Sequence, residues 1–534
     1  MKRILKAAAG LLLAPGIFAG CTGKEPAAPP PEKSAGKTEV LLGFSGLPAH
    51  FDPLNGFSNG VQLLYSGLVQ TDPDMNIIPD LAESYRVSGD ALTYTFTLRK
   101  DVLFSDGTPV SPEDVLFSYT TLMQNATSLD LSGVSRIRAQ DNTVEITLKK
   151  PNSVFILTVA QVGIVPKDAY TPDFALKPIG SGPFKLVQYD VDQQFILEAN
   201  ETYYGGVPEV KRVTFLKMAS EDTRLLAAKS GQVDITLVSA TIAASNRIPG
   251  YKLLVEKSVD NMGIAAPVTP NLGGKNEYGY SVGNNVTSDP GIRKALAFGL
   301  DRQKICADAL NGFGSPAYSE NDGMPWSNPE SAIPFDLEYA KKLLDDAGWI
   351  DTDGDGIREK GGLKASFSLL YFAGDSVRQA VGMAASQQAR TNLGLEIIVE
   401  GVGEEDIAKR MFSEPIILAW GSSNPMTSYM LFHSSNAGKN DWYNPENFRN
   451  ETVDRYLEAG LNASSLEEAL PFWKQAQWDG FTGTSMRGAA PYIFLINKDH
   501  LYFVREGLYT GRQKIHAHGE AWPLVANLRE WRWE

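Results

Sequence analysis

Strand and helix patterns alternate along nearly the whole chain after Val40, and this alternation restricts the fold more than any other feature. In ALTYTFTLR (91–99), apolar residues alternate with threonines, as in a strand with one buried face. In DLEYAKKLLDDAGW (336–349), apolar residues recur at helical spacing between an N-cap, Asp336, and a terminator, Gly348. SDPGIRKALAFGLDRQKI (288–305) begins another helix, with Asp289 as its cap. The sequence therefore predicts a mixed α/β or α+β protein with more than one domain.

Length and charge narrow the class of protein. A chain of 534 residues is too long for one ordinary core. Its 43% hydrophobic and 21% charged residues are typical of a soluble globular protein. The net charge of −14 argues against a nucleic-acid partner, because binding to phosphates needs a basic face.

The sequence of the N-terminus predicts a segment for export and membrane anchoring. A basic stretch, MKRILK, precedes the apolar AAAGLLLAPGIFAG (7–20), which is typical of a signal peptide over residues 1–20. Small residues lead into Cys21, as in a bacterial lipobox, so Cys21 is the predicted lipidation site; a plain signal peptide remains the alternative. Residues 21–38 are rich in Pro, Ala, Lys and Glu and are interpreted as a flexible linker. Cys306 then has no cysteine partner and is expected to be a buried apolar residue.

Several segments resemble one known family. They are DLAESYRVSGDALTYTFTLRKDVLFSDGTPVSPEDVLFS (80–118), IGSGPFKL (179–186), NETYYGGVPEVKRVTF (200–215), DPGIRKALAFGLDRQKI (289–305) and YAKKLLDDAGW (339–349). Together they are similar to the family 5 extracytoplasmic solute-binding proteins, the oligopeptide, dipeptide and nickel receptors of ABC importers. The residues of these segments indicate structural roles and not ligand binding. Ser111 is placed to cap a helix, and SGPF is expected to enter a sheet at its edge.

The resemblance implies a two-lobed periplasmic-binding-protein fold of type II, with a hinge between the lobes and cargo held by closure. Lobe I would span 39–262 with an inserted subdomain near 72–178, lobe II would span 263–490, and residues 491–534 would return to lobe I. It also implies a monomer without enzymatic activity or cofactor, held by its lipid at the extracytoplasmic or periplasmic face of the membrane. Its partners would be a small ligand, an ABC permease and, through the permease, an ATPase.

The segment ILAWGSSNPMTSYMLFHSS (417–435) is the predicted ligand loop, because an apolar run there breaks into small polar residues. The candidate ligand-binding residues are Trp420, Ser422, Ser423, Asn424, Tyr429, His433 and, from the first loop of lobe I, His50. Peptide-binding relatives often have an aspartate after the tryptophan that pairs with the α-ammonium group, and this chain has Ser422 to Asn424 there. The first hypothesis is a small peptide or peptide-like solute.

The alternative is nickel or another metal chelate, whose coordination His50 and His433 from opposite lobes could complete. A signalling or chaperone-like receptor that does not transport ranks lower. The histidine pair HAH (516–518) is expected to be structural.

The acidic stretch DTDGDG (351–356) matches the start of an EF-hand loop. Asp351, Asp353, Asp355 and Gly356 occupy positions 1, 3, 5 and 6, but position 12, where a bidentate glutamate belongs, is Gly362. We interpret the stretch as a solvated turn between a helix and a strand, with weak calcium binding as the open alternative. An exported hydrolase is disfavoured, because no HExxH motif is present and GFSGL (43–47) lacks the second glycine of a nucleophile elbow.

Overall fold

The computed structural model describes residues 36–55, 60–125, 129–439, 442–519 and 522–534. The predicted signal peptide, Cys21 and most of the linker lie outside the described residues. Within the described residues, no helix combines the length and the apolar character needed to cross a membrane.

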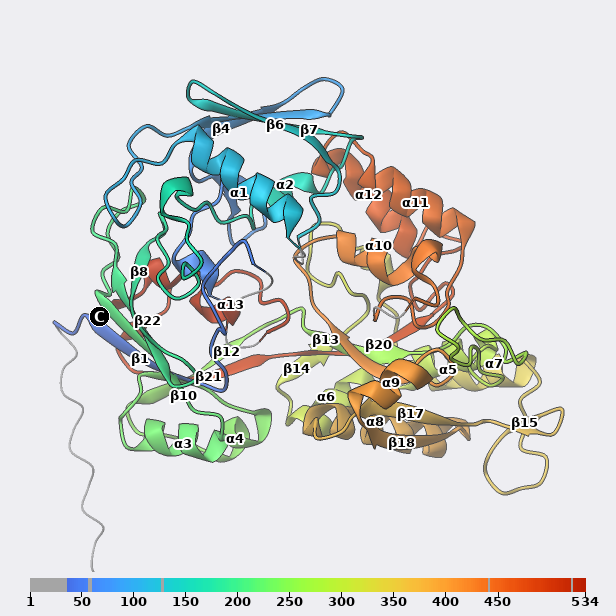
Figure 1. Ribbon diagram of the computed structural model, residues 1–534. Coiled ribbons are helices and arrows are strands. Elements are labelled where there is room, and N and C mark those ends of the chain that lie inside the picture. Colours follow the sequence, from blue (N-terminus) through green and yellow to red (C-terminus); the bar gives the residue numbers. More distant parts are fainter. Residues whose placement is uncertain (1–35, 56–59, 126–128, 440–441, 520–521) are drawn as a thin grey trace, which may run out of the picture.

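Two large sheets form the centres of two lobes (Figure 1). The first contains, in spatial order, β12 (Tyr251–Glu256), β21 (His500–Arg505), β11 (Ile235–Leu237), β1 (Glu39–Phe44), β10 (Arg212–Lys217), β9 (Gln194–Ala199) and β8 (Phe184–Asp190). The second contains β14 (Gly314–Pro316), β20 (Tyr492–Lys498), β13 (Asn261–Ala265), β19 (Ile416–Trp420), β17 (Ser366–Phe372) and β18 (Glu396–Val402). Each sheet mixes parallel and antiparallel neighbours, so the expected mixed α/β class is confirmed.

The first lobe carries an additional small sheet. Its four strands are β4 (Ala82–Val87), β5 (Thr93–Leu98), β7 (Thr143–Leu148) and β6 (Val134–Gln140), with α1 (Pro112–Gln124) and α2 (Phe155–Val159) nearby. In β5, Tyr94, Phe96 and Leu98 are buried, as the alternating pattern predicts. Ser111 caps α1 in a capping box with Asp114. Two short helices, α3 (Glu221–Lys229) and α4 (Ala240–Ser245), pack on the same lobe.

The second lobe holds most of the helices. They are α5 (Pro290–Gly299), α6 (Arg302–Leu310), α7 (Leu337–Asp346), α8 (Ser376–Gln388), α9 (Glu404–Arg410), α10 (Met426–Phe432), α11 (Glu451–Leu461) and α12 (Leu466–Gln477). The predicted caps are confirmed: Asp289 caps α5 and Asp336 caps α7. Cys306, on α6, is fully buried, as expected.

Short two-stranded pairs and one further helix complete the chain. They are β2 (Val69–Thr71) with β3 (Ile77–Pro79), β15 (Glu359–Lys360) with β16 (Leu363–Lys364), β22 (Leu508–Tyr509) with β23 (Arg532–Trp533), and α13 (Trp522–Val525). The strand begun by SGPF is β8, at the edge of the first sheet, as predicted.

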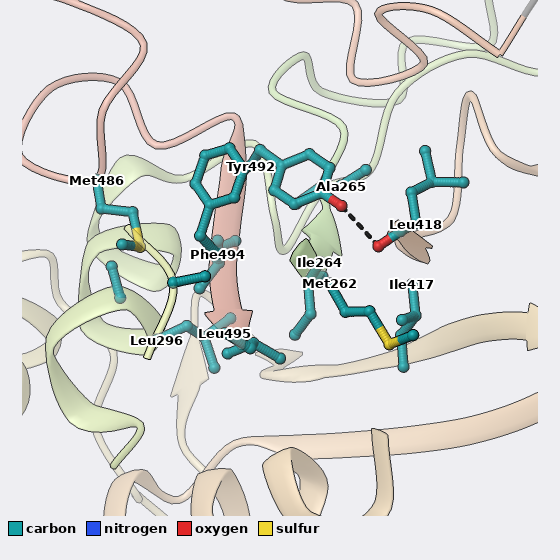
Figure 2. Close-up of a cluster of buried hydrophobic side chains, with 14 of the residues drawn as sticks. Met262, Ile264, Ala265, Leu296, Ile417, Leu418, Met486, Tyr492, Phe494 and Leu495 are labelled. Atoms are coloured by element: carbon teal, nitrogen blue, oxygen red, sulfur yellow. Dashed lines mark hydrogen bonds between the residues drawn. The ribbon is translucent and has the colours of Figure 1, made fainter. Parts of the chain in front are cut away.

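A first hydrophobic core fills lobe I beside a smaller cluster around α3 and α4, and a second core fills lobe II and also takes in Met75, Val154 and Leu157 of lobe I. Figure 2 shows part of the second core, where side chains from β13, β19, β20 and α5 meet. The Tyr492 hydroxyl within it donates to the Leu418 carbonyl at 2.7 Å, so the polar group of a fully buried ring is satisfied. Each lobe therefore has a main core of its own, as lobes that move as rigid bodies need, and the second core also contacts lobe I at α2.

The chain passes between the sheets through two adjacent segments. The first is 257–260, between β12 and β13; the second is Asp499, between β20 and β21 (Figure 1). Because β20 pairs with β13, lobe II extends to Lys498, and the return to lobe I comes later than the predicted boundary at 491. Likewise, β13 starts at Asn261, so the first crossing lies just before the predicted end of lobe I at 262. The local apolar pattern of β20 gave no indication of which sheet the strand would join.

Candidate ligand site

A cavity of about 450 Å³ lies where the two lobes meet. Lobe I contributes the turn after β1, the end of β11 and the start of α13, and lobe II contributes β13 and the start of α8. The lining residues are Ser45, Gly46, Leu47, Leu237, Asp260, Met262, Asp375, Val377, Arg378, Lys498, His518, Gly519 and Trp522. This volume is within the range for small-molecule sites.

Three strand-like segments meet at the back of this cavity: 258–260, 498–500 and 516–518. Val259 N donates to the His516 carbonyl at 2.9 Å, and Lys498 N donates to the Asp260 carbonyl at 3.0 Å. Two of the three segments are the crossings between the lobes, so the polar groups here belong to the hinge as well as to the cavity.

Asp260 is the charged centre of the hinge. Its fully buried carboxylate contacts His518 Nδ1 at 2.8 Å, His500 Nε2 at 3.4 Å and Lys498 Nζ at 3.4 Å. Burial alone would raise the pKa of Asp260, but the hydrogen bonds from His500 and His518 and the charge of Lys498 outweigh burial and lower it. Asp260 is therefore a fixed negative charge that holds Lys498 and His518 at the cavity wall.

The histidines around Asp260 differ in their environments. His516 is buried, and desolvation together with neighbouring His500 lowers its pKa to about 3, so it is neutral. The side chain of His518 is 59% exposed, and its hydrogen bond to Asp260 raises its pKa. His518, from the HAH pair that the sequence analysis interprets as structural, contacts Asp260 and also lines the cavity.

Arg378 provides a second cation on the lobe II side. It lies in the first turn of α8, pairs with the N-cap Asp375, and has its guanidinium 5.1 Å above the Phe372 ring. Its Nε is buried and has no hydrogen-bond partner. Among the charged lining residues, Asp260 and Asp375 balance Lys498 and Arg378, and protonation of His518 makes the lining net positive.

Apolar side chains also line the cavity. They belong to Leu47, Leu237, Met262, Val377 and Trp522. The Trp522 ring packs edge-on against Phe44 at 5.7 Å and is stacked over Phe215 at 6.0 Å, so the lobe I core fixes its position. The cavity therefore combines a few placed polar groups with an apolar surface, as ligand sites do.

The predicted ligand loop lies beside the cavity and does not line it. Trp420 ends β19 and stacks on Tyr443 at 5.3 Å, with its indole N–H buried and without a hydrogen-bond partner. The next residue, Gly421, accepts a hydrogen bond from His518 N at 3.3 Å, which joins the loop to the cavity wall. Beyond it, the half-buried Ser422, Ser423 and Asn424 form a turn in which Asn424 Oδ1 accepts from Met426 N.

The two histidines predicted for a metal chelate also lie outside the lining. His433 is 8% exposed, is stacked on Tyr429 at 4.3 Å, and contacts Ser435 and Glu458 through its two ring nitrogens. His50 is half-buried, and its Nδ1 accepts from Asp52 N at 3.3 Å. The roles assigned to His50, Tyr429 and His433 remain predictions.

Some of the residues at and behind the cavity that the sequence analysis missed are charged or polar residues inside apolar strand patterns. Asp260 interrupts VDNMGIA (259–265), and Lys498 and His500 interrupt the run YIFLINKDHLYF (492–503). Charged residues are rarely buried without a partner, so such interruptions are a usable signal for a site. Arg378 and His518 give no comparable local signal.

Comparison with known proteins identifies the family. The model of bacterial extracellular solute-binding proteins, family 5, matches residues 76–442. Protein XP55 of Streptomyces lividans is 32% identical over 88% of this chain and 85% of its own length. The oligopeptide-binding protein AppA of Bacillus subtilis is 27% identical, covering 86% of this chain and 87% of its own.

Solved structures agree on the fold. The structure of NikZ from Campylobacter jejuni in complex with Ni(L-His) superposes with a TM-score of 0.74 at 23% identity, over 93% of this chain and 99% of that one. The predicted two-lobed periplasmic-binding-protein fold is thereby confirmed. The chain belongs to the family 5 extracellular solute-binding proteins, the substrate-binding components of ABC importers.

Proposed function

We propose that the cavity between the lobes is the cargo site, and that its cargo is a small peptide or peptide-like solute with a carboxylate group. The observation that carries the proposal is that Arg378, Lys498 and His518 line one cavity together with several apolar side chains. A guanidinium in the lining is suited to bind a carboxylate, and the apolar residues of the lining suit a side chain.

The position of the charges at the hinge suggests how cargo would drive closure. A solute that contacts Trp522 from lobe I and Arg378 from lobe II makes both contacts only when the lobes are closed. It stabilises the closed state by that difference in affinity. The closed receptor would then dock on an ABC permease, with the transport energy supplied by the permease's ATPase.

A metal chelate is the second candidate, favoured by the imidazole of His518, 59% exposed at the cavity wall. AppA is named for oligopeptides, and NikZ was solved with a nickel–histidine complex. Both kinds of cargo contain carboxylates, so Arg378 and Lys498 suit either, and only the chelate would use His518 as a metal ligand.

We further propose the finer features predicted from the N-terminus: a signal peptide, a lipid on Cys21, and a monomeric receptor without catalytic activity at the extracytoplasmic face. The non-transport receptor remains the lowest-ranked alternative. A mature N-terminal peptide without lipid, or release of the wild-type chain from membranes by salt alone, would contradict the anchor.

Native mass spectrometry of gently purified protein tests the cargo site. A co-purifying peptide mixture supports the first hypothesis, and a metal with its chelator supports the second. We expect Arg378→Gln to weaken the affinity for that cargo roughly ten- to hundredfold, the loss typical of one charge-assisted hydrogen bond. The matched control is Arg390→Gln, an exposed arginine outside the cavity. Equal affinities for the two variants would refute the site.

A further inference from the structure

Four carboxylates converge at the outer edge of lobe II, in the loop between α7 and β15. Asp351, Asp353, Asp355 and Glu359 each place one oxygen so that all four lie within 4.8 Å of one another. The three aspartates are exposed and Glu359 is buried. In Figure 1 this loop and the β15 hairpin lie at the far end of lobe II, away from the crossings between the lobes.

Glu359 is the observation that points to a ligand. Its side chain belongs to a residue only 8% exposed, and Oε1 is buried without a hydrogen-bond partner. Its other oxygen, Oε2, accepts from Thr352 N at 2.9 Å and Thr352 Oγ1 at 2.8 Å, which fixes the carboxylate. A buried carboxylate oxygen without a donor costs free energy, and a coordinated cation would remove that cost.

The protein's own cations do not neutralise the cluster. The Lys364 ammonium contacts Asp353 at 3.4 Å and Asp355 at closer range. Arg358, the neighbour of Glu359, instead pairs with Asp345 on α7 at 2.5 Å. One contacting ammonium against four carboxylates leaves a strongly negative site.

The donor set selects the class of cation. All four side chains offer carboxylate oxygen, which suits hard cations, and the absence of histidine or cysteine from the set disfavours zinc. Calcium accepts six to eight oxygens in irregular geometry, whereas magnesium needs a near-ideal octahedron. Gly354 and Gly356, at φ +79° and +84°, allow the tight turns that bring Asp351, Asp353 and Asp355 together.

We propose that residues 351–359 bind one calcium ion, with Glu359 supplying the carboxylate that an EF-hand loop takes from position 12. The affinity should lie in the range of extracellular calcium modules, a Kd on the order of 10⁻⁴ to 10⁻³ M, because Glu359 has one oxygen without a hydrogen-bond donor, where the glutamate of an EF-hand offers two. The ion joins the end of α7 to the β15–β16 hairpin. It does not contact the cargo cavity, whose lining includes none of its ligands.

Calcium titration of the full-length mature protein in chelator-treated buffer tests the proposal. Isothermal calorimetry with CaCl₂ measures affinity directly, and MgCl₂ serves as the comparison. Terbium luminescence offers an independent signal, since Trp349 lies just before the loop and can sensitise a bound lanthanide. We expect saturable calcium binding at one site and at least tenfold weaker magnesium binding.

Three variants and one control locate the ion. Glu359→Gln and Asp353→Asn preserve shape and remove one charge each, and both should weaken calcium binding at least tenfold. Lys364→Met removes the competing ammonium and should tighten it. Asp346→Asn removes an exposed carboxylate on α7 that pairs with Lys342, and should leave the affinity unchanged.

No calcium binding by the wild-type protein up to 10 mM would overturn the proposal, whatever the variants do. So would a Glu359→Gln variant that binds calcium as the wild type does, because the ion would then lie elsewhere. Circular dichroism shows whether the glutamine variant folds, and Asp353→Asn replaces it if it does not.

Discussion

Removing the charge of Asp260 is the sharpest test of the hinge. The carboxylate is 1% exposed and contacts Lys498, 15% exposed, His500, fully buried, and His518, 59% exposed. Asp260→Asn preserves volume and one acceptor oxygen, but leaves the Lys498 ammonium and the His500 ring without their anion. Removing one partner of a buried charge pair lowers the free energy of unfolding by about 3–5 kcal/mol.

His518 is exposed and Lys498 is partly exposed, so water can replace part of the lost interaction. We therefore expect Asp260→Asn to lower the free energy of unfolding by about 2–3 kcal/mol, which is below that range. The assay is equilibrium urea unfolding followed by tryptophan fluorescence and circular dichroism, with coincidence of the two curves as the check for two-state behaviour.

The matched control is Asp192→Asn, which breaks the exposed pair with Lys217 at 2.8 Å. Surface ion pairs contribute about 0–1 kcal/mol, so this variant should unfold almost as the wild type does. If Asp260→Asn costs no more than Asp192→Asn, Asp260 does not hold the hinge together and the reasoning fails.

Three further predictions concern the cavity and the second core. The pKa of His518 is raised, so its positive charge is fully present below the unfolded pKa of about 6.5 and is lost as the pH rises through the folded pKa. Anionic cargo should therefore bind more weakly at pH 8.5 than at pH 5.5. His518→Gln should remove this dependence of the affinity on pH. Trp420 does not line the cavity but precedes Gly421, whose carbonyl accepts from His518 N, so Trp420→Ala should weaken cargo binding indirectly and without unfolding the protein; an unchanged dissociation constant would place Trp420 in the core alone. Gly263→Ala should cost about 1–3 kcal/mol in urea unfolding, because its Cβ would lie 2.4 Å from the Ile493 carbonyl oxygen, whereas Gly133→Ala, with open space around it, should not.

Local elements were predictable because their causes are local. The capping box of Ser111 and Asp114, the caps Asp289 and Asp336, and the one-sided burial of β5 all depend on residues within one or two turns of each other. The family and its two-lobed fold were predictable for a different reason. The segments that resemble the family build the framework of the fold, so they identify the fold without identifying the ligand.

The boundaries of the lobes depended on pairing between distant strands. β20 could have continued into lobe I by its apolar pattern alone, but it pairs with β13, more than two hundred residues earlier in the chain. Glu359 is a shorter-range example. It stands at position 9 of the loop, where an EF-hand often coordinates through water, and the bridge between Ile350 and Glu359 brings its carboxylate to the aspartates.

The sequence by itself determined the helices, the strands, their caps and the membership of a family. The tertiary structure alone decided which charges share the cavity, since Asp260, Arg378, Lys498 and His518 come from four separate segments. Their meeting depends on strand pairing across the chain and on the balance of burial against charge at the hinge, and neither is contained in any local pattern.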